Sequence, residues 1–185
     1  MPGDHCQKNP SLPRDGRKKP PMIRMILMRH AKSSWEDDVA DFDRPLNGRG
    51  LRDAPRIAAE LSNRGWSPDV VVHSAALRTT QTWELMASHF PEATQVISSK
   101  SLYHGSPADI RAVAEKLPAS CGTSLIIGHN PGWELAVNQL SSQNVRMTTA
   151  NAALFENVAG GWENAFAQPN PWQMIEILRP KELAS

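Results

Sequence analysis

Short apolar segments alternate with helix-like segments along most of this 185-residue chain, and this alternation constrains its fold more than any other feature. Four apolar segments stand out: RMILMRH (24–30), DVVVHS (69–74), the weaker TQVISS (94–99) and TSLIIGH (123–129). Short runs of this kind are typical of strands that are buried on both faces of a sheet. Because helices between such strands form parallel βαβ units, the sequence predicts an α/β fold: a three-layer α/β/α sandwich with a mostly parallel central sheet.

The segments between these strands carry apolar residues at the spacing of a helix. Residues 47–65 place four of them on one face, and Gly65 stands where this helix should end. The four are Leu51, Ile57, Ala58 and Leu61. A second helix is predicted over 76–90, with three side chains facing inward: Leu77, Leu85 and Met86. Ser106 as N-cap and Pro107 at the first helical position predict the start of a third helix, and a fourth follows the last apolar segment.

The end of the chain breaks the alternation. The segments AALFENV (152–158) and WQMIEIL (172–178) look like two strands without a helix between them, so we expect them to add antiparallel C-terminal strands to the sheet. The chain shows no internal repeat and no second-domain boundary, and residues 25–185 are predicted to form a single domain. Residues 1–24 contain five prolines and few large apolar side chains, which predicts a basic, disordered N-terminal extension.

Charge and cysteine content limit the possible partners and locations. Residues 1–24 carry a net charge of +4, so the remainder carries −3 of the total of +1 and is expected to show no general basic patch. We therefore expect no nucleic-acid and no membrane partner, while a basic tail that binds nucleic acid or lipid, or translation from Met22 or Met25, stays open. No segment approaches the roughly 18 apolar residues of a membrane-spanning helix. Cys6 and Cys121 offer neither a disulfide framework nor metal-ligand spacing, which favours a cytoplasmic location.

Polar residues come directly at the ends of three predicted strands. They are Arg29 and His30, His73 and Ser74, and His129. Because the carboxyl ends of parallel strands meet at one edge of the sheet, where open α/β sheets bind ligands, these residues should lie close together. Arg78 belongs to the first turn of the next helix and can reach the same place. The fold is thus predicted to gather two arginines and two histidines into one site.

Such a set of side chains suits one kind of chemistry. Guanidinium groups match the oxygens of a phosphoryl group with paired hydrogen bonds. A neutral imidazole can attack phosphorus, while a second imidazole and backbone N–H groups at a helix start near Pro131 hold the oxygens. The chain contains no Walker loop and no Cys/His metal-ligand spacing. We therefore predict phosphoryl transfer with no metal and no cofactor.

Five segments, in this order, resemble the histidine phosphatase superfamily and its phosphoglycerate mutase-like fold: LMRHA, DRPLNGRG, VVVHSAALRTTQT, LIIGHNPG and TTANAALFE. The resemblance covers roughly residues 25–180 and is strongest to the small bacterial, SixA-like phosphohistidine phosphatases, with RHA as the signature motif. It implies that His30 is the nucleophile and becomes transiently phosphorylated. It also implies that Arg29, Arg78 and His129 clamp the phosphoryl group.

Other side chains near these motifs have less specific interpretations. Three are candidates for substrate binding: Ser33, Ser34 and His104. His73 is interpreted as a structural residue beside the site. Arg44 is interpreted as an ion-pair partner of Asp41 or Asp43. Trp35 stands on the loop next to the nucleophile and could also contact a substrate.

One departure from the family pattern bears on the substrate. Larger members that act on phosphate esters carry a glutamate general acid after the third strand, whereas SLYHGSPAD (101–109) contains none. Expelling an alkoxide without an acid is difficult, but imidazole leaves readily because its conjugate acid has a pKa of about 6.5. Four aspartates on the loop after His30 could still substitute as acids: Asp37, Asp38, Asp41 and Asp43.

The residues and the resemblance together predict a function. We expect a phosphatase that works through a phosphohistidine enzyme intermediate on phosphohistidine, or another phosphoramidate, in a partner protein. The enzyme is expected to be a monomer or a weak dimer. Two alternatives stay open: a phosphatase for small phosphate esters, and a non-catalytic module that binds a phosphoryl group without turning it over.

Overall fold

The computed structural model describes residues 22–35, 38–158, 160–167 and 172–183. In these residues six strands form one sheet in the order β3-β2-β4-β1-β5-β6. The strands are β1 (Ile23–Arg29), β2 (Val70–Ser74), β3 (Gln95–Ser99), β4 (Thr123–Gly128), β5 (Ala152–Asn157) and β6 (Gln173–Leu178). Strands β1 to β4 run parallel, and β5 is antiparallel to both β1 and β6. The predicted mostly parallel sheet with antiparallel C-terminal strands is therefore confirmed.

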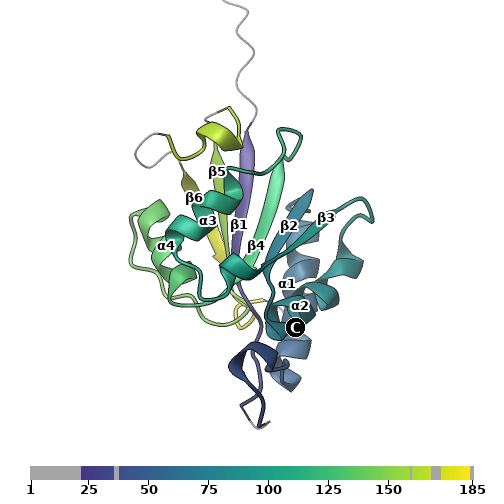
Figure 1. Ribbon diagram of the computed structural model, residues 1–185. Helices are drawn as coiled ribbons and strands as arrows, with labels where there is room; N and C mark the ends of the chain where they lie inside the picture. Colours follow the sequence, from purple (N-terminus) through teal and green to yellow (C-terminus); the bar gives the residue numbers. More distant parts are fainter. Residues whose placement is uncertain (1–21, 36–37, 159, 168–171, 184–185) are drawn as a thin grey trace, which may run out of the picture.

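Helices cover both faces of this sheet (Figure 1). α1 (Gly48–Asn63) and α2 (Leu77–Met86) pack on one face, and α3 (Pro107–Ala114) and α4 (Gly132–Ser141) pack on the other. The described residues also form four short 3-10 helices: η1 (Asp41–Asp43), η2 (Ala87–His89), η3 (Lys100–Leu102) and η4 (Trp162–Asn164). None of the helices in the described ranges is long and apolar enough to cross a membrane. The arrangement is the predicted three-layer sandwich.

Two helices begin at side chains that cap them. The Asn47 side chain accepts hydrogen bonds from the first N–H groups of α1, those of Arg49 and Gly50, each over 3.1 Å. At α3, Ser106 and Asp109 form a capping box, which confirms the predicted helix start. The end of the α1 segment is also as predicted, because Gly65 has a φ of +71°, a conformation that favours glycine.

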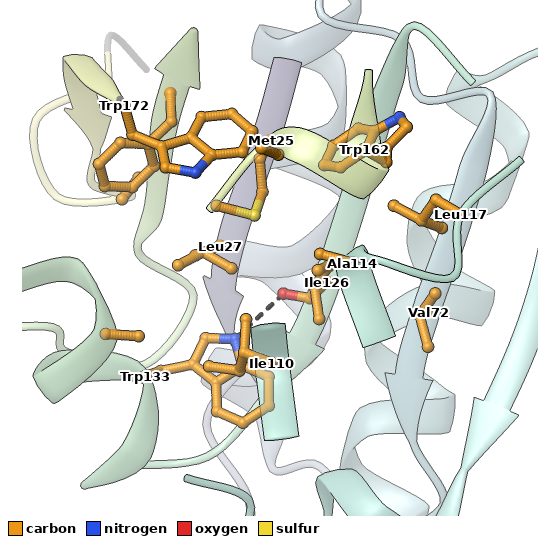
Figure 2. Close-up of a cluster of buried hydrophobic side chains, with 14 of the residues drawn as sticks. Met25, Leu27, Val72, Ile110, Ala114, Leu117, Ile126, Trp133, Trp162 and Trp172 are labelled. Atoms are coloured by element: carbon orange, nitrogen blue, oxygen red, sulfur yellow. Dashed lines mark hydrogen bonds between the residues drawn. The ribbon is translucent and has the colours of Figure 1, made fainter. Parts of the chain in front are cut away.

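Strand β1 lies at the centre of the core because its side chains are buried on both faces. Met25 and Leu27 contact the cluster under α3 and α4, where Trp133 packs (Figure 2). Ile26 and Met28 belong to the cluster under α1 and α2. Trp133 also donates its indole N–H to a backbone carbonyl of β4 over 3.1 Å (Figure 2). Since burying one such apolar side chain contributes about 1.5–3 kcal/mol, β1 and the residues at its end are firmly positioned.

The buried face of α1 differs from the prediction at one residue. Three of the predicted side chains are buried: Ile57, Ala58 and Leu61. Leu51 is 48% exposed, so its predicted inward orientation is wrong. Gly50 takes the buried position instead, because α1 packs so closely on the backbone of Lys32 that a Cβ at Gly50 would overlap it. Close backbone contact, rather than apolar spacing, thus determines the first turn of this helix.

The buried face of α2 is more polar than predicted. Met86 is buried as expected, but Leu77 and Leu85 are only partly buried. The buried side chains of this helix are Arg78, Thr79, Thr82, Trp83 and Met86. The two threonine hydroxyls donate to backbone carbonyls, so their burial leaves no unmet hydrogen bond. A helix whose first turn lies at the ends of the strands buries polar groups that apolar spacing does not reveal.

Strand β1 includes the last two residues of the predicted N-terminal extension, Ile23 and Arg24. Ile23 is buried in the core, and Arg24 forms an ion pair with Glu156 over 3.0 Å. Both residues therefore belong to the sheet. Residues 1–21 of the predicted extension lie outside the described residues.

A close approach of two glycines joins α4 to the loop that follows η3. A Cβ at Gly132 would overlap the carbonyl oxygen of Gly105. We expect Gly132→Ala to lower the free energy of unfolding by about 1–3 kcal/mol, because backbone must move to make room. Urea denaturation measures this. In the control Gly48→Ala, the new Cβ lies 3.8 Å from the Arg52 guanidinium and stability should not fall. Equal stability of the two variants would contradict the prediction.

Candidate active site

The carboxyl ends of β1, β2 and β4 meet at one edge of the sheet, where a pocket of about 190 Å3 lies. Four of its lining residues are those that the sequence predicted to come together: Arg29, His30, Arg78 and His129. The strand register explains this. Arg29 is opposite Gly128 in the β1–β4 ladder, and the His30 N–H donates to the Gly128 carbonyl over 3.0 Å. The rings of His30 and His129 consequently lie close, with centroids 5.1 Å apart.

A hydrogen bond to the backbone fixes the tautomer of His30. Its Nδ1 lies 2.7 Å from the carbonyl oxygen of Ala31. Because a carbonyl only accepts, Nδ1 must carry the proton, and Nε2 keeps the lone pair that a nucleophile needs. The N–H of Ala31 donates in turn to Thr82 Oγ1 over 3.0 Å, which ties this backbone to α2. These hydrogen bonds therefore fix both the orientation of the His30 ring and its tautomer.

His129 is oriented by a hydroxyl group from the neighbouring strand. Its Nε2 lies 2.8 Å from Ser74 Oγ, at the end of β2. Its Nδ1 is buried and has no hydrogen-bond partner within the described part of the chain. Buried polar atoms usually have partners, so an unpartnered nitrogen that belongs to a pocket residue indicates a place where a ligand oxygen could bind.

Both imidazoles are neutral at physiological pH. Burial is the largest cause: it lowers the pKa of His30 to about 3 and that of His129 to about 2. The nearby positive charge of Arg78 lowers both values further. The neutral form is the one that can attack phosphorus, so this environment suits His30 as a nucleophile.

Arg29 presents part of its guanidinium group to the pocket. Its Nη1 donates to the carbonyl of Met147 over 2.9 Å, which fixes the side chain against the segment before β5. Its Nε is buried and lacks a partner among the described residues. Burial lowers the pKa of Arg29, and the carboxylate of Glu134 opposes that effect. An arginine remains charged under these conditions and can bind a phosphoryl oxygen.

One carboxylate lies among the cations of the pocket. Asp41 forms an ion pair with Arg78 over 3.0 Å and another with Arg44 over 2.8 Å. Tyr103 adds a hydrogen bond from its hydroxyl group over 2.9 Å, and Arg78 also donates to the Asp41 backbone carbonyl. The expected pairing of Arg44 with Asp41 or Asp43 is therefore confirmed for Asp41. The carboxylate occupies donors of Arg78 that a phosphoryl group could otherwise use.

Comparison with known proteins places the chain in a family. A family model described as the histidine phosphatase superfamily, branch 1, matches residues 25–103. An uncharacterized chloroplastic protein of Arabidopsis thaliana is 35% identical in an alignment of 170 residues that covers 85% of this chain and 78% of that protein. The chain belongs to the histidine phosphatase superfamily. An uncharacterized protein of Mycobacterium tuberculosis is 33% identical over 132 residues, covering 71% of this chain and 78% of that protein.

Solved structures agree with this assignment. A Nakamurella multipartitia protein named as a phosphohistidine phosphatase, SixA, superposes with a TM-score of 0.76 and 26% identity, over 88% of this chain and 99% of that one. A phosphoglycerate mutase of Plasmodium falciparum has the same fold, with a TM-score of 0.60 and 14% identity, over 84% of this chain and 90% of that one. The predicted phosphoglycerate mutase-like fold and the similarity to the SixA-like branch are both confirmed.

The histidine phosphatase has an ionised Asp41 in its pocket. Partial burial by itself would raise the pKa of this carboxyl group. Hydrogen bonds from Arg44 and Tyr103, with the charge of Arg78, outweigh burial and hold the pKa well below its ordinary value. Asp41 is therefore no proton donor at neutral pH in this arrangement. Of the other aspartates considered as acids, Asp38 and Asp43 are exposed and do not line the pocket, and Asp37 lies outside the described residues.

The three candidates for substrate binding occupy different places in the phosphatase. Ser33 lines the pocket, and its hydroxyl accepts a hydrogen bond from Arg44 over 2.7 Å. Ser34 contacts the same arginine through its backbone carbonyl over 2.8 Å and is not a lining residue. His104 is exposed and lines the pocket, with its ring 4.1 Å from that of Tyr103. His73 is buried and does not line the pocket, and its Nδ1 forms a hydrogen bond with the Ser74 carbonyl over 2.8 Å. These contacts agree with the structural role that was expected for it.

Several residues of the site escaped the sequence analysis. Tyr103 bonds Asp41 and lies against the ring of His129 at 5.7 Å, and its place beside His104 in LYHG was the available signal. Thr82 also escaped, and it accepts a hydrogen bond from the N–H of Ala31, next to His30. Ser74 was predicted to lie at the site, but its hydrogen bond to His129 was not predicted. Trp35 was noted as a possible substrate contact. It lines the pocket, is 73% exposed and lies over the Arg44 guanidinium at 3.2 Å.

Replacing the carboxylate among the arginines should strengthen anion binding. In Asp41→Asn the negative charge that competes for Arg78 is lost, so we expect the dissociation constant of inorganic phosphate to fall several-fold. Isothermal titration calorimetry measures it. The control is Asp43→Asn, which removes an exposed carboxylate two positions away that does not line the pocket. Weaker phosphate binding by Asp41→Asn than by Asp43→Asn would contradict the prediction.

The two neutral histidines should make stability depend on pH. Below pH about 6.5 the unfolded chain binds protons at these imidazoles, while the folded chain does not until its lower pKa values are reached. The free energy of unfolding should therefore fall as pH falls from 7.5 to 5, by up to roughly 1.4 kcal/mol per pH unit for each histidine. Urea denaturation of His30→Gln and His129→Gln should give shallower slopes than the wild type. Unchanged slopes in both variants would refute this interpretation.

Proposed function

We propose that this histidine phosphatase removes the phosphoryl group from phosphohistidine, or from another phosphoramidate, on a partner protein through a phospho-His30 intermediate. One observation carries the choice of substrate. Asp41 is the carboxylate that lines the pocket within the described residues, and two arginines hold it ionised. A leaving group that needs no general acid therefore fits this site best. Imidazole is such a leaving group, whereas a serine or sugar alkoxide is not.

In the proposed reaction, Arg29 and Arg78 bind the phosphoryl oxygens, and Asp41 releases Arg78 as the phosphoryl group arrives. The lone pair of His30 Nε2 forms a bond to phosphorus while the bond from phosphorus to the substrate nitrogen breaks. The electron pair of that bond stays on the substrate nitrogen, which takes up a proton from solvent. Water then attacks the phosphoryl group on His30 and forms a bond to phosphorus. The bond from phosphorus to His30 Nε2 breaks with its electron pair returning to Nε2, a proton of the water passes to solvent, and phosphate leaves.

His129 is proposed to bind a phosphoryl oxygen through Nδ1. The Ser74 hydroxyl, 2.8 Å from Nε2, can donate to that nitrogen and so make Nδ1 the one that carries the proton. This Nδ1 is buried without a partner in the described chain, which leaves its N–H available to the ligand. A donor that is already in position costs no reorganisation as charge moves onto the oxygens.

A protein-borne substrate is favoured by the shape of the site. The pocket of about 190 Å3 is small, so it can take a phosphoryl group and an imidazole ring but little more. Trp35, at 73% exposure, offers an aromatic face beside the pocket to a partner surface. The similarity to structures named as SixA phosphohistidine phosphatases supports the same class of substrate. Monomer or weak dimer, cytoplasmic location, and absence of nucleic-acid or membrane partners stay predictions.

Covalent trapping tests the proposed intermediate. The protein is incubated with radiolabelled phosphoramidate and quenched in alkali, in which phosphohistidine is stable. We expect label that is lost in acid, and none in His30→Ala. The control His89→Ala, a histidine outside the pocket, should label like the wild type. Absence of label with phosphate binding intact would indicate a binding module, and label on His30→Ala would exclude His30 as the nucleophile.

A pair of peptides tests the substrate class. They share one sequence and differ only in carrying phosphohistidine or phosphoserine. We expect kcat/KM to be at least about a hundredfold higher for the phosphohistidine peptide, since general acid catalysis contributes that much to expulsion of an alkoxide. Equal rates for the two peptides would favour an ester substrate instead.

A further inference from the structure

A second pocket, of about 430 Å3, lies beside the active site. We call it the basic pocket because its lining includes five cationic side chains: Arg49, Arg56, Arg146, Arg179 and Lys181. They come from α1, from the segment before β5 and from the segment after β6. Since β5 is antiparallel to both β1 and β6, the carboxyl end of β6 lies at the same edge of the sheet as Arg29. The expectation of no basic patch beyond residues 1–24 is wrong at this edge.

The positive charge of the basic pocket is not balanced within its walls. Two carboxylates, Asp53 and Glu182, accompany the five cations, which leaves a net charge of +3. Two ion pairs within the walls are long: Arg49–Asp53 at 3.8 Å and Arg179–Glu182 at 3.5 Å. Arg146 and Lys181 are exposed and form no ion pair with any carboxylate in the described residues. Such long pairs near the surface contribute little, so Arg146, Arg179 and Lys181 are available to an external anion.

The basic pocket and the active site share a wall. Thr149 lines both, and Arg49 donates to its hydroxyl over 3.0 Å. The residues just before Thr149 also connect the two sites, since the Met147 carbonyl accepts a hydrogen bond from Arg29. A substrate whose phosphoryl group lies at His30 would therefore place adjoining groups next to the basic pocket.

We propose that the basic pocket binds a second oxyanion, carboxylate or phosphate, on the same substrate molecule. This inference rests on the proposed function and narrows its substrate class. On a partner protein the second oxyanion is an aspartate or glutamate side chain beside the phosphohistidine. Guanidinium groups bind both carboxylate and phosphate with paired hydrogen bonds, and five clustered cations attract either. The pocket adds affinity and orientation while the chemistry stays at His30.

Matched phosphohistidine peptides test this. One carries glutamates on both sides of the phosphohistidine, and the other carries glutamines at the same positions. We expect the wild type to show a kcat/KM about tenfold higher for the acidic peptide, and added salt to reduce that preference. In Arg179→Gln/Lys181→Gln the preference should shrink to about twofold or less.

The control is Arg52→Gln/Lys116→Gln, which removes the same total charge at two exposed positions outside the basic pocket. It should keep the full preference for the acidic peptide. If both double variants lose the preference equally, the proposal is wrong. If the wild type shows no preference for the acidic peptide, the second oxyanion is not a carboxylate of a partner protein, and the proposal then depends on the inhibitor comparison below. Phosphoramidate, which carries no second oxyanion, separates this from the proposed function: a wild type that cannot hydrolyse it fails that earlier proposal instead.

A second arm distinguishes the source of the oxyanion. Propane-1,3-bisphosphonate and propylphosphonate are compared as inhibitors of phosphoramidate hydrolysis. One outcome is that the wild type binds the bisphosphonate tenfold more tightly than propylphosphonate, that Arg179→Gln/Lys181→Gln does not, and that the enzyme does not prefer the acidic peptide. In that case the ligand is a small bisphosphorylated molecule. If the enzyme prefers the acidic peptide but binds the two inhibitors equally, the second oxyanion is a carboxylate of a partner protein. A preference in neither arm overturns the proposal.

Discussion

The burial of β1 between β4 and β5 is the constraint on which the rest of this structure depends. Its side chains are buried under helices on both faces, so the strand cannot shift without exposing apolar surface. Arg29 and His30 stand at its end, and the ladder with β4 brings His129 to them. The hydrogen bond from His30 to the Ala31 carbonyl then sets which nitrogen can attack. Position and protonation of the nucleophile thus both follow from the packing of one strand.

Electrostatics at the site combine burial with the positive charge of the arginines. Taking the imidazoles out of water keeps them neutral, and the positive charge of Arg78 reinforces that. The same arginine helps to keep Asp41 ionised. The pocket therefore holds a neutral nucleophile and permanent cations, but no carboxylic acid among its described lining. Such a site favours substrates that leave without protonation by the enzyme, and the adjoining basic pocket extends its preference for anions.

Much of the fold could be read from local patterns. The four parallel strands, the helix start at Ser106 and the helix end at Gly65 were predicted because apolar runs and cap residues act over a few positions. The gathering of Arg29, His30, Arg78 and His129 was predicted because parallel strands end at one edge. Prediction failed at Leu51 and at the buried face of α2, where close backbone contact and hydrogen-bonded polar groups replace apolar packing.

The sequence by itself determined the order of strands and helices, the family, and the residues that meet at the ends of the strands. It could do so because strand burial and helix capping depend on neighbouring residues. Only the tertiary structure decided that Asp41 lies between Arg44 and Arg78, that Ser74 orients His129, and that a basic pocket adjoins the site. Apart from the pair of Asp41 with Arg44, these contacts join residues far apart in the chain: Arg49 and Thr149, for example, are 100 positions apart. Long-range charge and hydrogen bonding depend on distances in space, which no local pattern encodes.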